Sequence, residues 1–460
     1  MIAAGEGALP VLALAAANML LYVGVYLCQA VVPLLTHSMG GGAAVIGWVG
    51  TAYFIGTVVM RIPAGMIADR WGRAAPLAAG AGLCAVAAVL LAIATSPLEQ
   101  AVFRCLQGIG LATFTTAVAP AVAALAGSGR LTHTLSFFGI STNIAAAVAP
   151  ATGIALLGRL GPVPGFGLAA AASIAAGVLA LRGPAGRRAE RAAGRGAPSP
   201  QPAHAAAPAA AQGPTAGPGT RRTSSRTAGP AAGPAAGLAA DPATGPSPSP
   251  ATGPATGLAA RPSARPAPAA VPAPLWPPLA AAAAFGITYA VHADFVPVIA
   301  AGRAIPAFGL YFTVYAAAII AVRAWGGRIG DRFGHVWMVV PGALFGAAAW
   351  LLLGRATSLP ALLAAAVLYA IAGGTIHPAC LAACIARAPA SRRGTASAAF
   401  YLAYDGGDAA GGPLVGGLMQ SASVPGALDI AALIGVVGAL GMAFGRPAKR
   451  AAAAGSPAGG

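Results

Sequence analysis

Charged residues are scarce in this chain. Asp, Glu, Lys and Arg make up 8% of its 460 residues, whereas about 25% is usual for soluble domains. Lysine occurs once, at Lys449. The sequence therefore lacks a nucleotide-binding P-loop of the form G-x-x-x-x-G-K-S/T, which excludes ATP hydrolysis by that motif. No serine or cysteine nucleophile stands beside a convincing base, so we expect neither an enzyme nor a bound cofactor.

Cysteine is also scarce, and its odd number offers no disulfide framework. Cys380 and Cys384 lie four residues apart, on one helix face, close to His377. A metal site there is one interpretation, but the packing of small apolar side chains is the favoured one, and we expect no metal. The five cysteines all fall within apolar runs: Cys28, Cys84, Cys105, Cys380 and Cys384.

Apolar sequence, in contrast, is abundant. Hydrophobic residues make up 57% of the chain and the mean hydropathy is +0.76. A helix that crosses a bilayer needs about 20 apolar residues. The first run lacks a basic segment before it and is too long for a cleavable signal. We predict an all-α membrane protein with twelve transmembrane helices, near residues 9–34, 43–66, 75–95, 98–124, 132–156, 163–181, 278–300, 306–326, 337–354, 359–385, 395–418 and 425–445.

The positive charge has a regular distribution. The formal net charge is +17, which by itself suggests nucleic acid as a partner. Of the 27 Lys and Arg residues, however, only Arg159, Arg303 and Arg355 fall in loops on one side, and Arg104 falls within a span. The others lie at the opposite helix ends, in the central segment or in the tail. This positive-inside bias predicts a multi-pass plasma-membrane protein with both termini cytoplasmic and no nucleic-acid partner.

The composition changes in the middle of the chain. Pro, Gly, Ala, Ser and Thr dominate there, and no aromatic residue occurs between Phe166 and Trp276. Such a segment cannot bury enough apolar surface to offset its chain entropy. We predict an N-terminal six-helix bundle over 1–182, a disordered cytoplasmic linker over 183–275, a C-terminal six-helix bundle over 276–446 and a cytoplasmic tail over 447–460.

One charged string occurs twice. "RIPAGMIADRWGR" (61–73) and "RAWGGRIGDRFGH" (323–335) share two arginines, two glycines and an aspartate at a single offset of 262 residues, and Tyr53 and Tyr315 share that offset. A second pair of strings, 130–150 and 393–413, begins with Arg and ends with Pro in each half. Two halves with parallel topology are one of the ways in which transporters are built, with substrate bound between them.

These strings resemble the loop signature of the major facilitator superfamily. "RCLQGIG" (104–110) is similar to the fourth-helix motif of its proton-coupled exporters, and "APATG" (149–153) to their fifth-helix motif, with Ala149 in place of the usual Gly. The resemblance covers the whole chain apart from the linker. It implies two pseudo-symmetric six-helix bundles, alternating access and function as a monomer.

The resemblance also implies a cytoplasmic gate in each half. Asp69 would contact the start of the eleventh helix, near 393–395, and Asp331 the start of the fifth, near 131–132. A carboxylate is stabilised beside the unpaired N–H groups of a helix N-terminus. A generic positively charged loop is the alternative. The predicted gate residues are Gly65, Asp69, Arg70, Gly72, Arg73, Gly327, Asp331, Arg332 and Gly334.

Ionisable residues within membrane spans are functional candidates, because each costs about 2.5–3.5 kcal/mol to insert. Asp405 lies 12 residues beyond Arg393, which is about 18 Å of helix and so near midplane. It shares a polar stripe with Ser397 and Tyr401. We predict it as the main proton-coupling site, although structural hydrogen bonds are an alternative role for every member of the set. The coupling candidates are Asp405, Asp294, Arg104, His377 and Asp408.

Two further groups complete the predicted site. Uncharged polar residues in the spans are candidates to line a cavity, or else to bridge helices: Gln29, Gln107, Asn143 and Tyr401. Prolines and a nearby glycine mark helices that can bend, although close packing is the alternative: Pro150, Gly153 and Pro413.

The sequence thus favours a secondary transporter that exports a small polar organic molecule in exchange for protons. Proton-coupled uptake is the second interpretation, and a non-transporting membrane scaffold or sensor is the third. We expect a small-molecule substrate, protons and the lipid bilayer as partners. The scarcity of aromatic residues favours a polar or zwitterionic solute over an apolar drug.

Overall fold

The computed structural model describes residues 8–125, 131–182, 275–333, 336–389 and 392–444. Residues 183–274 of the predicted linker, and the predicted tail, lie outside the described residues. All the described helices belong to one compact unit. The described residues contain helices and no strand, so the predicted all-α fold is confirmed.

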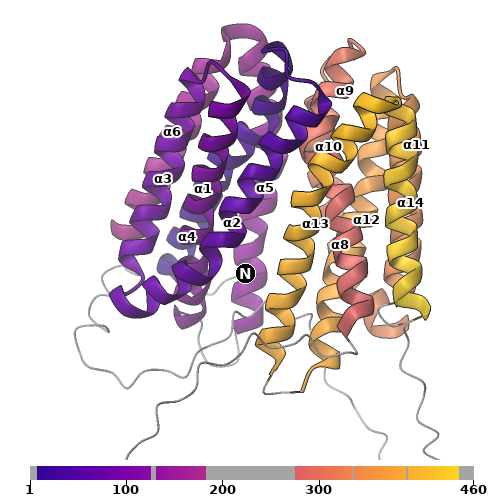
Figure 1. Ribbon diagram of the computed structural model, residues 1–460. Coiled ribbons are helices and arrows are strands. Elements are labelled where there is room, and N and C mark those ends of the chain that lie inside the picture. Colours follow the sequence, from indigo (N-terminus) through magenta and orange to yellow (C-terminus); the bar gives the residue numbers. More distant parts are fainter. Residues whose placement is uncertain (1–7, 126–130, 183–274, 334–335, 390–391, 445–460) are drawn as a thin grey trace, which may run out of the picture. The chain divides into compact units, whose positions relative to one another are not determined.

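Six helices form the first bundle and six membrane-crossing segments the second (Figure 1). The first bundle consists of α1 (Ala8–Ser38), α2 (Ala43–Trp71), α3 (Ala74–Ile93), α4 (Pro97–Leu125), α5 (Leu131–Leu160) and α6 (Pro162–Arg182). The second consists of α8 (Trp276–Ala290), η2 (Val291–Phe295), α9 (Val296–Gly302), α10 (Leu310–Phe333), α11 (Val336–Arg355), α12 (Leu359–Arg387), α13 (Arg393–Ser421) and α14 (Val424–Phe444), where α8, η2 and α9 form one crossing.

Ten of these crossings in the described residues are long and apolar enough to span a bilayer by themselves. The two exceptions are α10, whose apolar part covers only Leu310–Arg323, and α13. Helix α10 ends in the repeated charged string, and α13 carries the polar stripe with Asp405 and Asp408. Polar sequence in these two helices therefore lowers their hydropathy, which is expected of helices that face a cavity.

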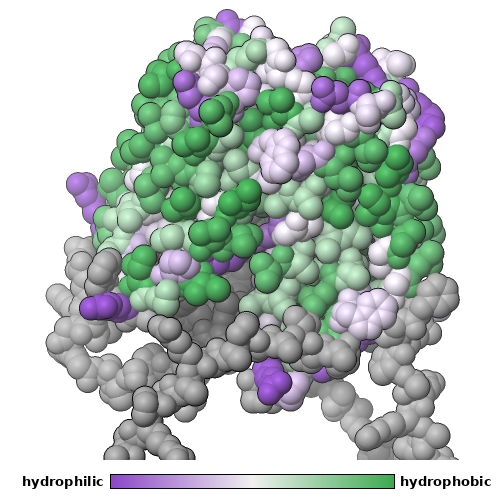
Figure 2. Space-filling model, viewed as in Figure 1, coloured by the Kyte–Doolittle hydropathy of each residue, from purple (hydrophilic) through white to green (hydrophobic). Residues whose placement is uncertain are grey.

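Large apolar side chains cover the outer flanks of the helices, and hydrophilic ones gather at the upper end of the view (Figure 2). Ile62, Ile93 and Leu98 are among the exposed ones. This arrangement suits lipid as the surrounding solvent, because a soluble protein rarely exposes apolar patches of such extent. The same view shows a hollow in its lower half, between the two bundles.

The bundles contact each other through α2 with α13 and through α5 with α10. The first contact is glycine-mediated: a Cβ at Gly47 would overlap the carbonyl oxygen of Gly412, and one at Gly416 would overlap that of Ala43. Small residues allow two helix backbones to approach closely, where van der Waals contact replaces the hydrophobic effect. Both of these glycine contacts lie near the start of α2 and near the end of α13.

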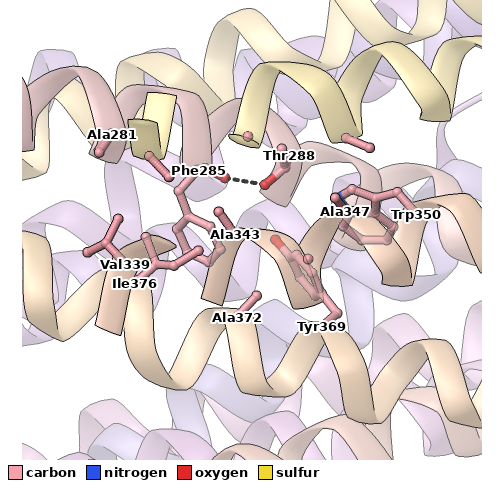
Figure 3. Close-up of a pocket in the computed structure, with 14 residues that line it drawn as sticks. Ala281, Phe285, Thr288, Val339, Ala343, Ala347, Trp350, Tyr369, Ala372 and Ile376 are labelled. Atoms are coloured by element: carbon pink, nitrogen blue, oxygen red, sulfur yellow. Dashed lines mark hydrogen bonds between the residues drawn. The ribbon is translucent and has the colours of Figure 1, made fainter. Parts of the chain in front are cut away.

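A small internal void lies within the second bundle itself (Figure 3). Its volume is about 10 Å³, and side chains from α8, α11, α12 and α14 surround it, Trp350 and Tyr369 among them. Thr288 donates a hydrogen bond to the carbonyl of Phe285 at its edge, 2.8 Å away. This void is too small for an organic solute and belongs to the packing of the bundle.

Candidate substrate cavity and buried charges

A cavity of about 420 Å³ lies between the bundles, with walls from α1, α2, α4 and α5 on one side and from α8, η2, α10, α12 and α13 on the other. That volume equals about fourteen water molecules at ~30 Å³ each. It falls in the range of ~300–1,000 Å³ that is usual for small-molecule sites. The cavity is therefore large enough for an organic solute.

Tyrosine dominates the walls. The chain has nine tyrosines, and seven line the cavity: Tyr22, Tyr26, Tyr53, Tyr289, Tyr315, Tyr401 and Tyr404. The other two, Tyr311 and Tyr369, contact His292 at its side. The low aromatic content of the sequence thus conceals a concentration of aromatic rings at one place. The aromatic content of the whole chain was a poor guide to the walls of the site, because it averages the cavity-lining positions with all the others.

Arg61 and Asp405 form an ion pair across the two bundles. The guanidinium of Arg61 on α2 donates to a carboxylate oxygen of Asp405 on α13 at 2.7 Å, and it also lies 5.7 Å from the centre of the Tyr401 ring. The Arg61 side chain is 41% exposed and that of Asp405 is 8% exposed. Asp405, the main predicted coupling residue, therefore already has a cationic partner in this conformation.

Asp408 has no such partner. It lies on α13, three residues from Asp405, which is ~4.5 Å further along the helix. The residue is 1% exposed, lines the cavity, and both carboxylate oxygens are buried without a hydrogen-bond partner among the described residues. Its electrostatic neighbours include Asp294, Asp405 and Arg104. A bare carboxylate in such a place is costly, and a proton removes most of that cost.

Asp294 points from the second bundle toward the first. A Cβ at Gly50 of α2 would lie 2.6 Å from the carboxyl carbon of Asp294, so glycine at that position makes room for the acid. Asp294 and His292 both belong to η2, a π-helical turn, which is often found at functional sites. His292 instead packs within the second bundle, with its ring centre 4.2 Å from that of Tyr315. The turn therefore aims two titratable side chains at different neighbours.

Arg104 supplies the second buried cation. It lies on α4, is 2% exposed, donates to the Gln107 side chain at 2.5 Å and stacks over the Tyr53 ring at 4.3 Å. Its charge acts on Asp294 and on Asp408. Arg104 and Gln107 lie behind the cavity wall, whereas the other predicted lining residues, Gln29, Asn143 and Tyr401, lie on it.

His377 lies on the wall of the cavity, on α12. Its ring packs edge-on against Phe400 and Tyr404, with ring centres 5.0 and 5.1 Å away. Arg323, the counterpart of Arg61, acts electrostatically on His377 and on Tyr401. His377 thus lies among aromatic rings and near a cation, apart from the group of three aspartates.

Two threonines join the bundles through equivalent hydrogen bonds. Thr51 on α2 donates to the carbonyl of Ala409 at 2.5 Å, and Thr313 on α10 donates to that of Ala147 at 2.8 Å. Thr51 and Thr313 are 262 residues apart, as are Ala147 and Ala409. Pro413 has no N–H for the carbonyl four residues before it, which is that of Ala409. Thr51 therefore satisfies an acceptor that the proline leaves open.

The comparison with known families agrees with this arrangement. A profile described as the Major Facilitator Superfamily matches residues 14–305 and 269–459, which together cover most of the chain. The chain belongs to the major facilitator superfamily. A relative in Bacillus subtilis (strain 168), the "Uncharacterized MFS-type transporter YvkA", is 29% identical over 123 residues, a match that spans 27% of this chain and 28% of the relative's length.

Solved structures share the fold of this family member at low sequence identity. The nucleoside transporter NupG matches with a TM-score of 0.68 at 12% identity, over 95% of this chain and 99% of its own. A POT family transporter in complex with a thioalcohol-conjugated peptide matches with a TM-score of 0.68 at 12% identity, over 94% and 95%. A bacterial homologue of the human lysosomal transporter Spinster, in an inward-facing and unoccupied conformation, matches with 0.63 at 14%, over 96% of each chain.

The predicted gate lies at the helix ends opposite the threonine bonds. Gly72 ends α2 with a φ of 78°, a conformation that side chains disfavour, and this explains the glycine in the loop motif. Arg70 is exposed, and Arg73 precedes α3. The side chains of Asp69, Asp331 and Arg332, the surroundings of Gly327, and Gly334 lie outside the described residues. Their gate role stays a prediction.

The remaining predicted positions lie within continuous helices. Pro150 of α5 lines the cavity, and Gly153 packs against Leu27 and Val31 of α1. Pro413 lies within α13. Sequence reasoning missed Gly50, Arg61 and Arg323 as cavity residues. The shared offset of the two arginines was a signal for them, but the room that Gly50 makes for Asp294 depends on contacts between distant segments.

Proposed function

We propose that this protein exchanges protons for a small organic substrate across the plasma membrane by alternating access, in the direction of export. Its membership of the major facilitator superfamily supports transport. The proposal of proton exchange rests on one observation, the group of three carboxylates that face two arginines between the bundles.

The charges of this group do not balance. Asp294, Asp405 and Asp408 come from the second bundle, and Arg61 and Arg104 from the first. Arg323 lines the same cavity but acts on His377 and Tyr401 and lies outside this group. Within the group, three ionised carboxylates would exceed two guanidinium charges by one negative charge. A single proton makes the group neutral, and burial favours that state. Asp408, whose oxygens have no partner among the described residues, is the member that holds the proton in this conformation.

Movement of the bundles would change that arrangement. The Arg61–Asp405 pair, the approach of Asp294 to Gly50 and the two threonine bonds all join one bundle to the other. Rocking of the bundles separates each acid from its partner and admits water. The proton affinities of the three acids then change together, which couples proton binding to the conformational cycle. Under the positive-inside bias, the cavity faces the cytoplasm when the threonine bonds are made.

The test is transport into vesicles that hold the purified full chain. Asp408→Asn should lose accumulation driven by a pH gradient at every substrate concentration, because asparagine cannot carry the proton. Asp405→Asn should show the same loss, since it releases Arg61 to neutralise Asp408. Asp429→Asn is the matched control, because Asp429 pairs with Arg355 at the partly exposed end of α14.

Each outcome is decisive for the proposal. Accumulation at the level of the unmodified protein in both Asp408→Asn and Asp405→Asn would contradict proton exchange through this group. Proton-coupled uptake remains the second candidate, because the same acids suit a proton that travels with the substrate. Proton movement opposite to that of substrate supports exchange, and movement in the same direction supports uptake.

A further inference from the structure

The cavity combines aromatic walls with two ionisable groups that have no partner in the described part of the chain. Arg323 of α10 lines it and makes no hydrogen bond or ion pair among the described residues. Asp408 lines it as well, and its oxygens are equally without partners in the described part of the chain. Arg61 and Asp405, the other charged residues on the wall, neutralise each other. One cation and one acid are thus available to a solute.

These two groups occupy different places in the cavity. Arg323 occupies the position in the second bundle that Arg61 occupies in the first, and both cations act on Tyr401. Asp408 lies one helical turn beyond Asp405. Its charge acts on the hydroxyl groups of Tyr289, Tyr369 and Tyr404. A solute in this cavity contacts tyrosine rings, because seven tyrosines line its walls.

We infer that the cavity binds a zwitterion with an aromatic body, its anionic group on Arg323, its cationic group on the Asp408 carboxyl and its ring among the tyrosines. A guanidinium suits a carboxylate because it presents two parallel N–H donors. An ammonium group gains both from the acid and from the faces of neighbouring tyrosines. The ring gains from offset or edge contacts with the walls. The inference deepens the proposed function and rests on it only for the coupling step below.

Simpler charge classes fit the cavity less well. A purely cationic amine would leave Arg323 without a partner and place two positive charges in one cavity. A purely anionic solute would leave Asp408 in its protonated form and without a partner for its carboxyl group. A sugar would stack on tyrosines but would leave both charged groups unused. Only a zwitterion provides a partner for each group.

The substrate's cation and the proton would then compete for one carboxyl group. With the cavity empty, Asp408 holds the proton. When the ammonium group arrives, Asp408 releases its proton to water in the cavity, and the ammonium takes its place as the neutralising charge. Substrate and proton therefore occupy the site in turn, and this alternation produces exchange rather than joint transport.

Equilibrium binding tests the substrate class with matched probes. L-phenylalanine carries the ring and both charges, whereas phenethylamine lacks the carboxylate, 3-phenylpropionate lacks the ammonium and L-alanine lacks the ring. L-tryptophan and the dipeptide phenylalanyl-phenylalanine extend the series in size. Binding at equal concentration is measured as the rise in the unfolding midpoint of the purified full chain. At least one aromatic zwitterion should bind roughly tenfold more tightly than each incomplete probe, which is about the effect of one charge-assisted hydrogen bond.

Substitutions at Arg323 and Asp408 test which charged group of the substrate each residue binds. Arg323→Gln should remove the advantage of the aromatic zwitterion over phenethylamine, and Arg323→Lys should restore part of it. Asp408→Asn should remove the advantage over 3-phenylpropionate. Arg159→Gln, at an exposed position near the end of α5, is the matched control and should leave every affinity unchanged.

The inference is overturned if none of the three aromatic zwitterions raises the midpoint, or if phenethylamine, 3-phenylpropionate or L-alanine does so equally well. It is also overturned if both variants keep the unmodified order of affinities. Vesicle transport separates this result from the proposed function. A bound aromatic zwitterion that a pH gradient fails to move supports the substrate class and contradicts proton exchange. If a pH gradient instead drives the transport of a solute of another class, that result supports proton exchange and contradicts the inferred substrate class.

Discussion

Tyr53 and Tyr315 occupy equivalent positions in the two bundles, 262 residues apart, but have very different surroundings. Arg104 stacks over Tyr53 and is held by Gln107. His292 and Tyr369 pack against Tyr315. The residues 262 positions beyond Arg104 and Gln107 are Ala366 and Tyr369. One bundle therefore has a buried cation where the other has an aromatic cluster.

The features that the bundles share lie at their contacts and on the cavity wall. Thr51 and Thr313 donate to equivalent carbonyls, and Arg61 and Arg323 face the same cavity. The features that differ supply the chemistry: the buried cation lies in the first bundle, and the three buried acids lie in the second. Duplication thus explains how the bundles meet, whereas divergence explains how charge comes to be unevenly placed across their interface.

The largest effect should follow when the first bundle is given the second bundle's residue. In Arg104→Ala, the first bundle carries alanine at this position, as the second bundle does at the equivalent residue, Ala366. Removal of one partner from a buried charge group costs about 3–5 kcal/mol, so gradient-driven transport should fall by roughly 100-fold or more. Arg104→Lys keeps the charge and should retain a larger share. Initial transport rates in vesicles measure the effect, with Arg159→Ala as the exposed control. A rate in Arg104→Ala above one-tenth of normal, roughly, would contradict the role of this cation.

A second, smaller effect should come from the contact between the bundles at Gly50. In Gly50→Ala, the new methyl group collides with the carboxyl group of Asp294 and displaces the acid. Transport should fall by about tenfold, within the 1–3 kcal/mol range that is usual for overpacking. Gly82→Ala on α3 is the matched control, because a Cβ there meets nothing within 4 Å. Equal transport in the two variants would show that the position of Asp294 is unimportant.

Substitution of the aspartate should slow transport more in the first loop motif than in the second. Asp69→Asn should slow the conformational cycle without loss of substrate binding, because a charge at a helix N-terminus contributes about 0.3–2 kcal/mol. Asp331→Asn should be milder, because its loop has His335 where the first has Arg73. Transport rates and equilibrium binding, measured in parallel, check both statements. A loss of binding in a folded Asp69→Asn protein would contradict the gate role.

The smallest effect on transport should come from the threonine bonds, whose loss acts on the stability of the protein. Thr51→Val leaves the Ala409 carbonyl without a donor and should cost about 1–3 kcal/mol of stability. Pro413→Ala restores an N–H to that carbonyl and should reduce the cost of Thr51→Val, so that the two changes are not additive. Unfolding midpoints of the four variants of this cycle measure the coupling. The cycle of Thr313→Val with Pro150→Ala should show weaker coupling, because Pro150 frees the carbonyl of Ala146 rather than that of Ala147. Additive changes in both cycles would disprove the link to proline.

The sequence alone determined the class of fold, because its causes are local. Apolar runs of membrane length, the duplicated charged string and the one-sided distribution of arginine each act within a short segment or along the whole chain. The duplication also identified Tyr53 and Tyr315 as equivalent positions, and Arg61 and Arg323 likewise, from the shared offset alone. The membrane acids were recognisable one by one, since each is expensive wherever it lies in a span.

Only the tertiary structure decided which of these groups meet. It paired Asp405 with Arg61, left Asp408 without a partner among the described residues, and brought seven dispersed tyrosines to one cavity. The π-helical turn at Val291–Phe295, which aims Asp294 at Gly50, has no clear signature in the sequence. The physical reason is that a charge takes its properties from the neighbours that surround it, and these come from helices hundreds of residues apart. Sequence periodicity places a side chain on a face of its helix but does not say which helix will lie opposite.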